Sequence, residues 1–181
     1  MAQKMAQKMA QKTEGQPTTA EADVTIVLTW LGHSTVVLDL DGVRVVADPL
    51  LRRHNGPLRR RGPHPNPQAW SGAQAVLLSH LHHDHAEVAS LSMLPGVPVL
   101  TSAQNADWVA RKGLLGRGMR EDEWVGVDQA SSVEVRLVPA VHHSRPMPHR
   151  PNVANGHLVK GPSGVVWFAG DTDIHAGMED L

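Results

Sequence analysis

The stretch Ser79-His80-Leu81-His82-His83-Asp84-His85 follows an apolar segment at residues 75–78 and decides how the chain is interpreted. It contains four histidines and one aspartate, whose imidazole and carboxylate groups resist burial unless they are hydrogen-bonded or bound to a metal. If a strand ends at His80, its two-residue period puts His80 and His82 on one side, where both can bind one ion. Asp84 and His85 follow the turn and suit a second, neighbouring ion. The alternative is a solvated loop that happens to be rich in histidine.

Length and composition favour one globular domain. The chain has 181 residues, of which 41% are hydrophobic and 19% charged, enough for one core but not for two domains of ordinary size. Its net charge of -1 argues against a general nucleic-acid binder. The absence of cysteine excludes disulfides and thiolate metal sites and is compatible with a reducing cytoplasm. We therefore expect a cytoplasmic protein that acts on a small molecule.

Residues 1–23 are predicted to form a disordered, low-complexity tail, and the folded domain is predicted over residues 24–181. The tail begins with MAQK three times over and has too few large apolar residues to bury a face. No apolar run follows its lysines, so we expect no secretory signal, and no segment is long enough to span a bilayer.

The folded part begins with β-branched runs at residues 24–31, 35–40 and 43–47, which predict an antiparallel meander. Asp41-Gly42 marks a hairpin between the second and third runs. His33 falls at the turn between the first two runs, either as a hydrogen-bonded turn residue or as a ligand.

Further elements are predicted along the rest of the chain. Helices are expected at 86–94 and 103–112, strands at 97–101, 132–140, 157–160 and 165–169, an extended segment at 121–127, and a glycine-rich turn at 113–118. Two of these strands end at chemically active residues. The strand at 132–140 leads to His142 and His143, and the strand at 165–169, which looks buried, leads to Gly170-Asp171. A carboxylate after a glycine at the tip of an apolar strand is a common place for catalysis.

A long loop at residues 50–72 carries five arginines and four prolines and no acidic residue. Loops of this length in compact domains tend to be functional or mobile. The arginines suit a phosphate or carboxylate of a substrate, and a solvated loop is an equal alternative.

The combination of His80, His82, Asp84, His85, His142 and Asp171 resembles the metallo-β-lactamase superfamily of metal-dependent hydrolases. Four phrases are similar to the branch containing N-acylphosphatidylethanolamine phospholipase D and ascorbate 6-phosphate lactonase. They are Trp30-Leu31-Gly32-His33-Ser34-Thr35, Ala47-Asp48-Pro49, Pro139-Ala140-Val141-His142 and Phe168-Ala169-Gly170-Asp171-Thr172. The resemblance covers residues 29–172.

This resemblance implies an α/β (α+β) fold, the αββα sandwich of the superfamily, of which the chain carries the first half and the start of the second. It implies that His80, His82 and His142 hold one metal, that Asp84 and His85 hold another, and that Asp171 bridges the two. His142 is preferred to His143 because it follows the Pro-Ala-x phrase.

The chain departs from the superfamily pattern in one respect. The second metal normally has a further histidine late in the chain, and His175 is too close to Asp171 in sequence to be that residue, although a substitute role for it stays open. We therefore expect a chain that is truncated at its C-terminus, degraded, or completed by association through an open sheet edge.

The implied activity is hydrolysis of an ester, lactone or phosphodiester by a metal-bound hydroxide. Two Zn²⁺ ions are expected, with iron or manganese as alternatives. Asp84 or Asp171 is expected to orient the attacking water, and His33, His143 and Arg59 to contact the substrate or support the ligands. The alternatives are a catalytically impaired metal-binding remnant and a subunit that acts only in a complex.

Overall fold

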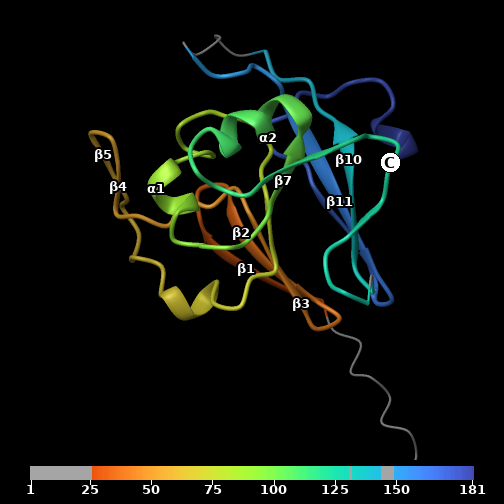
Figure 1. Cartoon of the computed structure of the whole chain (residues 1–181), viewed down its shortest axis with the longest axis horizontal. Coiled ribbons are helices and arrows are strands. Elements are labelled where there is room, and N and C mark those ends of the chain that lie inside the picture. The colour runs from red at the N-terminus through yellow and green to blue at the C-terminus, as the bar shows by residue number, and fades with distance from the viewer. Residues whose placement is uncertain (1–25, 131, 144–148) are drawn as a thin grey trace, which may run out of the picture.

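The computed structural model describes residues 26–130, 132–143 and 149–181, so the predicted tail at 1–23 lies outside the described residues. Two sheets pack face to face, and Figure 1 shows β10 and β11 in a separate layer beside β1, β2 and β3.

The first sheet has six strands in the order β1-β2-β3-β6-β7-β8. The strands are β1 (Ile26–Gly32), β2 (Thr35–Leu40), β3 (Val43–Ala47), β6 (Ala75–Leu77), β7 (Val99–Ser102) and β8 (Gly116–Met119). The first three are antiparallel, as predicted, while β3, β6, β7 and β8 run parallel. Asp41 and Gly42 have φ angles of 50° and 81°, the left-handed pair that a tight hairpin requires.

The second sheet is antiparallel, in the order β12-β11-β10-β9. Its strands are β9 (Val125–Gly126), β10 (Glu134–Pro139), β11 (Asn155–Gly161) and β12 (Gly164–Phe168). The predicted alternation in β10 is confirmed, because Val135 and Leu137 are both buried, as is the preceding Val133.

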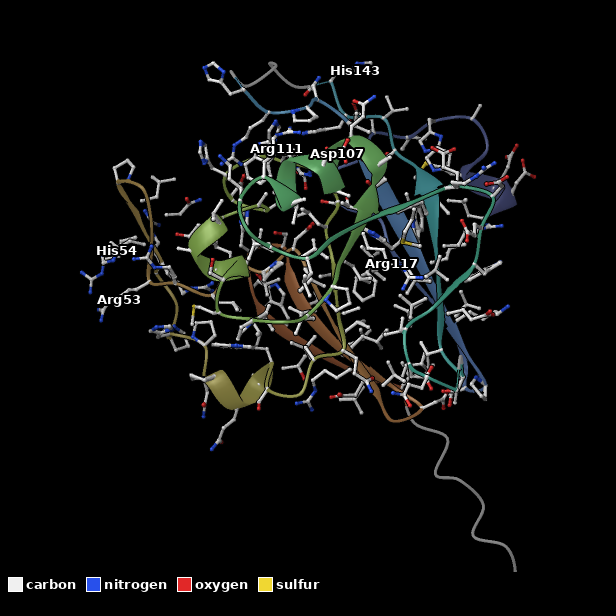
Figure 2. All side chains as sticks on the ribbon, viewed as in Figure 1. Arg53, His54, Asp107, Arg111, Arg117 and His143 are labelled. Atoms are coloured by element: carbon white, nitrogen blue, oxygen red, sulfur yellow. The ribbon has the colours of Figure 1, made fainter. Side chains whose placement is uncertain are left out.

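Shorter elements complete the fold. The helices are α1 (Val88–Leu91) and α2 (Ala103–Ala110), with 3-10 turns at η1 (Pro67–Ala69) and η2 (Met178–Asp180). The arginine-rich loop contains a small hairpin of β4 (His54–Asn55) and β5 (Leu58–Arg59). Figure 2 shows Arg53 and His54 at one edge of the molecule, on this projecting hairpin.

Two apolar cores define three layers. One core lies between the sheets and joins residues such as Leu38 and Val45 to Val135 and Val159. The other lies on the opposite face of the first sheet, where Val46 and Val76 meet residues of the helical side such as Leu91 and Trp108. Among the described residues no α-helix covers the outer face of the second sheet, so three layers of the expected αββα sandwich are present.

Two sequence expectations were wrong. The second half of the predicted glycine-rich turn at 113–118 belongs to strand β8, where Gly116 and Gly118 let helix α2 approach closely. A Cβ on Gly118 would lie 2.9 Å from Cα of Ala103, and one on Gly116 would collide with the Ala106 carbonyl. The predicted buried strand at 165–169 is an edge strand with Val165 56% exposed. Only its Val166 and Phe168 pack on the core.

Candidate metal centre

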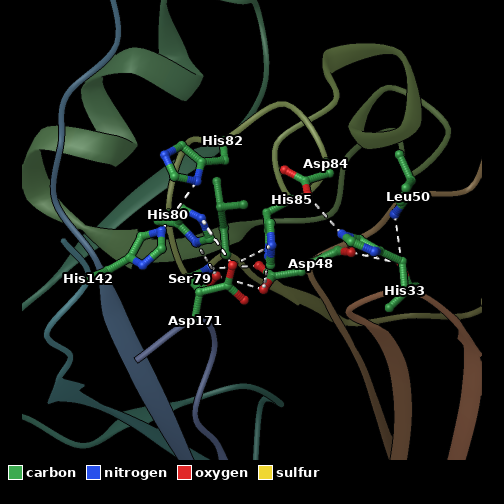
Figure 3. Close-up of polar contacts among 12 residues, drawn as sticks. His33, Asp48, Leu50, Ser79, His80, His82, Asp84, His85, His142 and Asp171 are labelled. Atoms are coloured by element: carbon green, nitrogen blue, oxygen red, sulfur yellow. Dashed lines mark hydrogen bonds and ion pairs between the residues drawn. The ribbon is translucent and has the colours of Figure 1, made fainter. Parts of the chain in front are cut away.

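The candidate site lies where four loops meet beyond the ends of strands. Asp48 follows β3, Ser79 to His85 follow β6, His142 follows β10, and Asp171 follows β12. Because β3 and β6 are parallel neighbours, their carboxyl ends bring Asp48 and the histidine stretch together. Figure 3 shows these side chains pointing toward one another. Strand β6 ends at Leu77, so His80 and His82 lie in a loop and not on a strand as predicted.

Three histidines form the first candidate ligand group. Ligand atoms of His80, His82 and His142 all lie within 4.8 Å of one another. Nε2 of His142 is 3.3 Å from Nδ1 of His82, so two ring nitrogens face each other. Such a pair needs a proton or a cation between or beside its two nitrogens.

Two further groups share the remaining predicted ligands. His33, Asp84 and His85 form one, in which Nε2 of His33 is 2.9 Å from Oδ2 of Asp84. His80, His85 and Asp171 form the other. Oδ2 of Asp171 lies 3.3 Å from Nε2 of His85 and 4.0 Å from Nε2 of His80. Asp171 therefore stands between the histidines of the first group and those of the second.

The donor set fits a metal ion. Nε2 of the buried His80 makes no hydrogen bond with any described residue, although Nδ1 of the same ring is 2.9 Å from Oγ of Ser79. An unpaired buried polar atom is costly, and it faces other ligand-type atoms here. Imidazole and carboxylate are the ligands expected for Zn²⁺ and for other first-row divalent metals.

A buried carboxylate holds two of the candidate ligands. Asp48 is only 4% exposed, and it accepts hydrogen bonds from the backbone N–H of Ser79 at 2.8 Å and from Oγ of Ser79 at 2.6 Å. Its Oδ2 also lies 2.8 Å from Nδ1 of His85. Sequence reasoning gave Asp48 no role, although a carboxylate directly after the apolar strand β3 was a usable signal.

Ionisation in this cluster follows from burial and partners. Burial disfavours the charged form of Asp48, but hydrogen bonds from His85 and Ser79 outweigh this and lower its pKa. Burial likewise works against protonation of His85, and the contact with Asp48 reverses it, so the pKa of His85 is raised. Burial lowers the pKa of His80 to about 4. His80 is thus neutral near pH 7, with a lone pair available to a metal.

The pKa of His82 is lowered for the same main reason as that of His80. Burial, and then the neighbouring His142, lowers the pKa of His82. Burial therefore favours the neutral form of both His80 and His82, which is the form that binds a metal.

Arg150, from a loop distant in the sequence, forms hydrogen bonds to the histidine stretch and stabilises it. Nη1 of Arg150 donates to the carbonyls of Leu81 at 2.6 Å and Ala86 at 3.4 Å, and Nη2 lies 3.0 Å from Nδ1 of His83. Its guanidinium also stacks over the Trp108 ring, 4.6 Å from the centroid. Arg150 was not singled out from the sequence, because its partners are remote along the chain.

The loops that carry His142 and Asp171 are tied to each other. The backbone N–H of Val141 donates to Oγ1 of Thr172 at 3.0 Å, and that of Asp173 donates to the Val141 carbonyl at 2.7 Å. These bonds flank the two candidate ligands and hold them side by side.

The other predicted site residues lie further out. His143 is exposed and belongs to none of the three ligand groups, and neither does His175. Arg59 is exposed on β5 and lines a cavity beside the second group. His33 joins the second group, so it is closer to the centre than its turn position suggested.

Fold and site together define a two-sheet protein in which candidate His and Asp metal ligands lie beyond the ends of strands. Residues 27–179 match the Beta-lactamase superfamily domain, and the chain belongs to that family. The superfamily membership expected from the sequence is therefore confirmed.

Relatives and solved structures agree with this assignment. A UPF0173 metal-dependent hydrolase of Cereibacter sphaeroides is 30% identical over 158 residues, covering 83% of this chain and 65% of the relative. Igni18, a metallo hydrolase from Ignicoccus hospitalis, has a similar fold, with a TM-score of 0.68 at 23% identity over 86% of this chain and 65% of that one. CmlA, a diiron β-hydroxylase from Streptomyces venezuelae, reaches a TM-score of 0.61 at 20% identity over 84% of this chain and 31% of that one. The chain thus spans less than two thirds of each.

None of the helices in the described part of the chain has the length and hydrophobicity needed to cross a bilayer.

Proposed function

We propose that the chain carries the metal centre of a metal-dependent hydrolase that cleaves an ester, lactone or phosphodiester. The observation that carries this proposal is Nε2 of His80, which is buried without a hydrogen-bond partner among the described residues and faces Asp171. The similarity to a protein described as a metal-dependent hydrolase supports the reaction class.

The proposed ligands follow the three groups. His80, His82 and His142 would hold one divalent ion and Asp84 and His85 the other, with Asp171 between them. We assign His33 as a third side chain for the second ion, because its Nε2 lies 2.9 Å from Oδ2 of Asp84. His33 would then take the place of the late histidine ligand of the second ion. From the sequence, His175 was the only candidate for that place.

Two such ions supply Lewis-acid activation of water and stabilise negative charge on the substrate oxygen. Asp171 or Asp84 would orient the attacking water through a carboxylate oxygen. Asp48 would hold the His85 ring in one orientation through Nδ1, which leaves Nε2 as the ligand atom. Zinc is the proposed metal because imidazole nitrogens and carboxylate oxygens are ligands that it commonly takes in proteins. Iron is the main alternative, and one fold neighbour is itself a diiron protein.

The first test measures metal content and turnover together. The chain is purified, its metals are counted by mass spectrometry, and hydrolysis of bis-p-nitrophenyl phosphate, p-nitrophenyl acetate and a γ-lactone is followed. We expect two equivalents of metal and turnover of at least one substrate. His82→Ala should abolish turnover while the circular dichroism spectrum is retained, and His54→Ala, which changes an exposed histidine outside the ligand groups, should leave turnover intact.

The same measurements separate the rival functions. One equivalent or none, without turnover, would support a metal-binding remnant. Turnover that appears only in a larger assembly, detected by light scattering, would support a subunit that acts in a complex. Unchanged turnover in His82→Ala would refute the ligand assignment.

A further inference from the structure

A cavity of about 580 Å³ opens directly beside the second ligand group. His33 and Asp84 form the wall that it shares with the metal centre, and the arginine-rich loop forms much of the rest. Its volume lies within the range of small-molecule sites, roughly 300 to 1,000 Å³. We call this cavity the arginine pocket.

The positive charge of the arginine pocket is largely uncompensated. Arg52, Arg53, Arg59, Arg60 and Arg61 all line it, and among the described lining residues the only carboxylate is that of Asp84. Asp84 is itself paired with His33, and Arg52 has a partner in Glu87 at 3.5 Å. The side chains of Arg53, Arg59 and Arg61 form no hydrogen bond or ion pair with any described residue. Their guanidinium groups are therefore available to an anion, which arginine binds bidentately.

Arg60 differs from the other arginines, because its guanidinium is hydrogen-bonded to backbone carbonyls and supports the pocket wall. Arg60 donates through Nη1 to the Leu31 carbonyl at 2.7 Å and through Nη2 to the Leu50 carbonyl, so it fastens the loop to the end of β1. Gly32, at φ 99°, makes room for this guanidinium, because a Cβ there would collide with Nη1 of Arg60. The backbone N–H of Arg60 also bonds the Arg53 carbonyl at 2.9 Å. The Arg60 side chain thus ties the loop to β1 through Leu31, and its backbone N–H closes the β4–β5 hairpin within the loop.

The pocket also has an apolar side. Trp30 is 70% exposed and Leu58 is 69% exposed, and both line the cavity together with Leu31. The Trp30 ring is held in place, because its Nε1 donates to the His33 carbonyl at 2.7 Å. An aromatic face and two leucines beside free guanidinium groups match a ligand with an anionic group joined to a hydrocarbon part.

We infer that the arginine pocket binds the non-reacting part of the substrate, and that this part is a phosphate or carboxylate joined to an apolar group. This inference rests on the proposed function, because the pocket is adjacent to the metal centre through His33 and Asp84. It narrows the substrate to an anionic amphiphile and assigns the arginines of residues 50–72 to recognition.

The test measures binding separately from catalysis. Octyl phosphate is titrated into the metal-loaded chain by calorimetry, below its micelle concentration, and compared with inorganic phosphate and octanol. We expect octyl phosphate to bind at least about tenfold more tightly than either fragment. Octanoate in place of octyl phosphate identifies whether the phosphate or the carboxylate is the preferred anion.

Variants locate the binding. The double variant Arg53→Ala/Arg59→Ala should weaken octyl phosphate binding by at least about tenfold, since each lost charge-assisted hydrogen bond is worth that order. Arg117→Ala, which removes an exposed arginine on β8 outside the pocket, is the matched control and should bind normally. Leu58→Ala should weaken octyl phosphate more than inorganic phosphate. Melting temperatures confirm that each variant is folded.

The outcomes distinguish this inference from the proposed function. His82→Ala should still bind octyl phosphate within about threefold of the parent chain, because His82 does not line the pocket. Binding lost in His82→Ala but kept in the double arginine variant would place the anion on the metals and overturn the inference. Equal affinities for inorganic phosphate and octyl phosphate would overturn the inference that the pocket recognises an apolar group. Arginine-dependent binding in a chain without turnover would leave the pocket standing while the proposed function fails.

Discussion

Oδ2 of the buried Asp48 lies 2.8 Å from Nδ1 of His85, although 37 residues separate them in the chain. The same carboxylate accepts two hydrogen bonds from Ser79, whose Oγ in turn lies 2.9 Å from Nδ1 of His80. Asp48 thus orients the imidazole of His85 directly and that of His80 through Ser79. Supporting partners of this kind tune both ring orientation and ligand basicity.

Asp48→Asn should weaken metal binding by about 10- to 100-fold, since the amide lacks the charge that holds His85 and its NH₂ opposes the Ser79 donors. Competition with a chromogenic chelator measures the affinity. Asp39→Asn is the control, because Asp39 pairs with Arg44 in a part-exposed position away from the centre. Equal affinity in the Asp48 variant and the control would show that Asp48 serves only the fold.

His142 and His143 should behave differently although they are adjacent. His142→Ala is expected to lose one metal equivalent, because its Nε2 faces His82 in the first ligand group. His143→Ala should retain both equivalents, since His143 is exposed and lies outside the groups. Metal counting by mass spectrometry decides between them. Loss of metal in the His143 variant alone would reverse the assignment.

Arg150→Lys should lower the free energy of unfolding by about 1 to 3 kcal/mol, because an ammonium group cannot keep the two-sided contact with the Leu81 carbonyl and the His83 ring. Arg111→Lys, at the exposed end of α2, should change it by less than about 0.5 kcal/mol. Urea denaturation of the metal-free proteins gives both values. A difference smaller than the fitting error would show that the histidine loop does not depend on Arg150.

His157 should make the fold sensitive to acid independently of the metal centre. Burial lowers its pKa to about 4, and its ring lies 3.1 Å from the Leu100 carbonyl. In the unfolded chain the pKa of His157 is about 6.5, so below that pH His157 is protonated in the unfolded chain but stays neutral in the folded one. The free energy of unfolding therefore falls as the pH drops from about 6.5 toward about 4. The loss approaches about 3 kcal/mol at the low end, at 1.36 kcal/mol per pKa unit.

The comparison for this prediction is His157→Leu, which cannot titrate. Unfolding free energies of both metal-free proteins are measured from pH 7 to pH 4, and the parent chain should lose more stability over that window. Parallel pH profiles would mean that His157 does not remain neutral in the folded chain.

Much of the candidate ligand set is recognisable in the sequence, because metal chemistry restricts which residue types can serve and brings several of them close together in the chain. His80, His82, Asp84 and His85 lie within six residues, and His142 and Asp171 each follow a strand whose hydrophobic pattern is readable. The opening meander was predictable for the same reason, since β-branched runs and the Asp41-Gly42 turn are local signals. Strand β8 could not be predicted in this way, because glycines in a sequence usually indicate a turn. Here Gly116 and Gly118 are required by the close packing of helix α2, which depends on the tertiary structure.

The sequence by itself determined which groups are available for metal chemistry and which short segments deliver them. Only the tertiary structure decided which groups support one another, because those contacts join distant parts of the chain. Arg150 reaches Leu81 across 69 residues, and His33 reaches Asp84 across 51. Local sequence sets backbone preference and side-chain chemistry, whereas the pairing of distant side chains depends on strand order and packing of the whole domain.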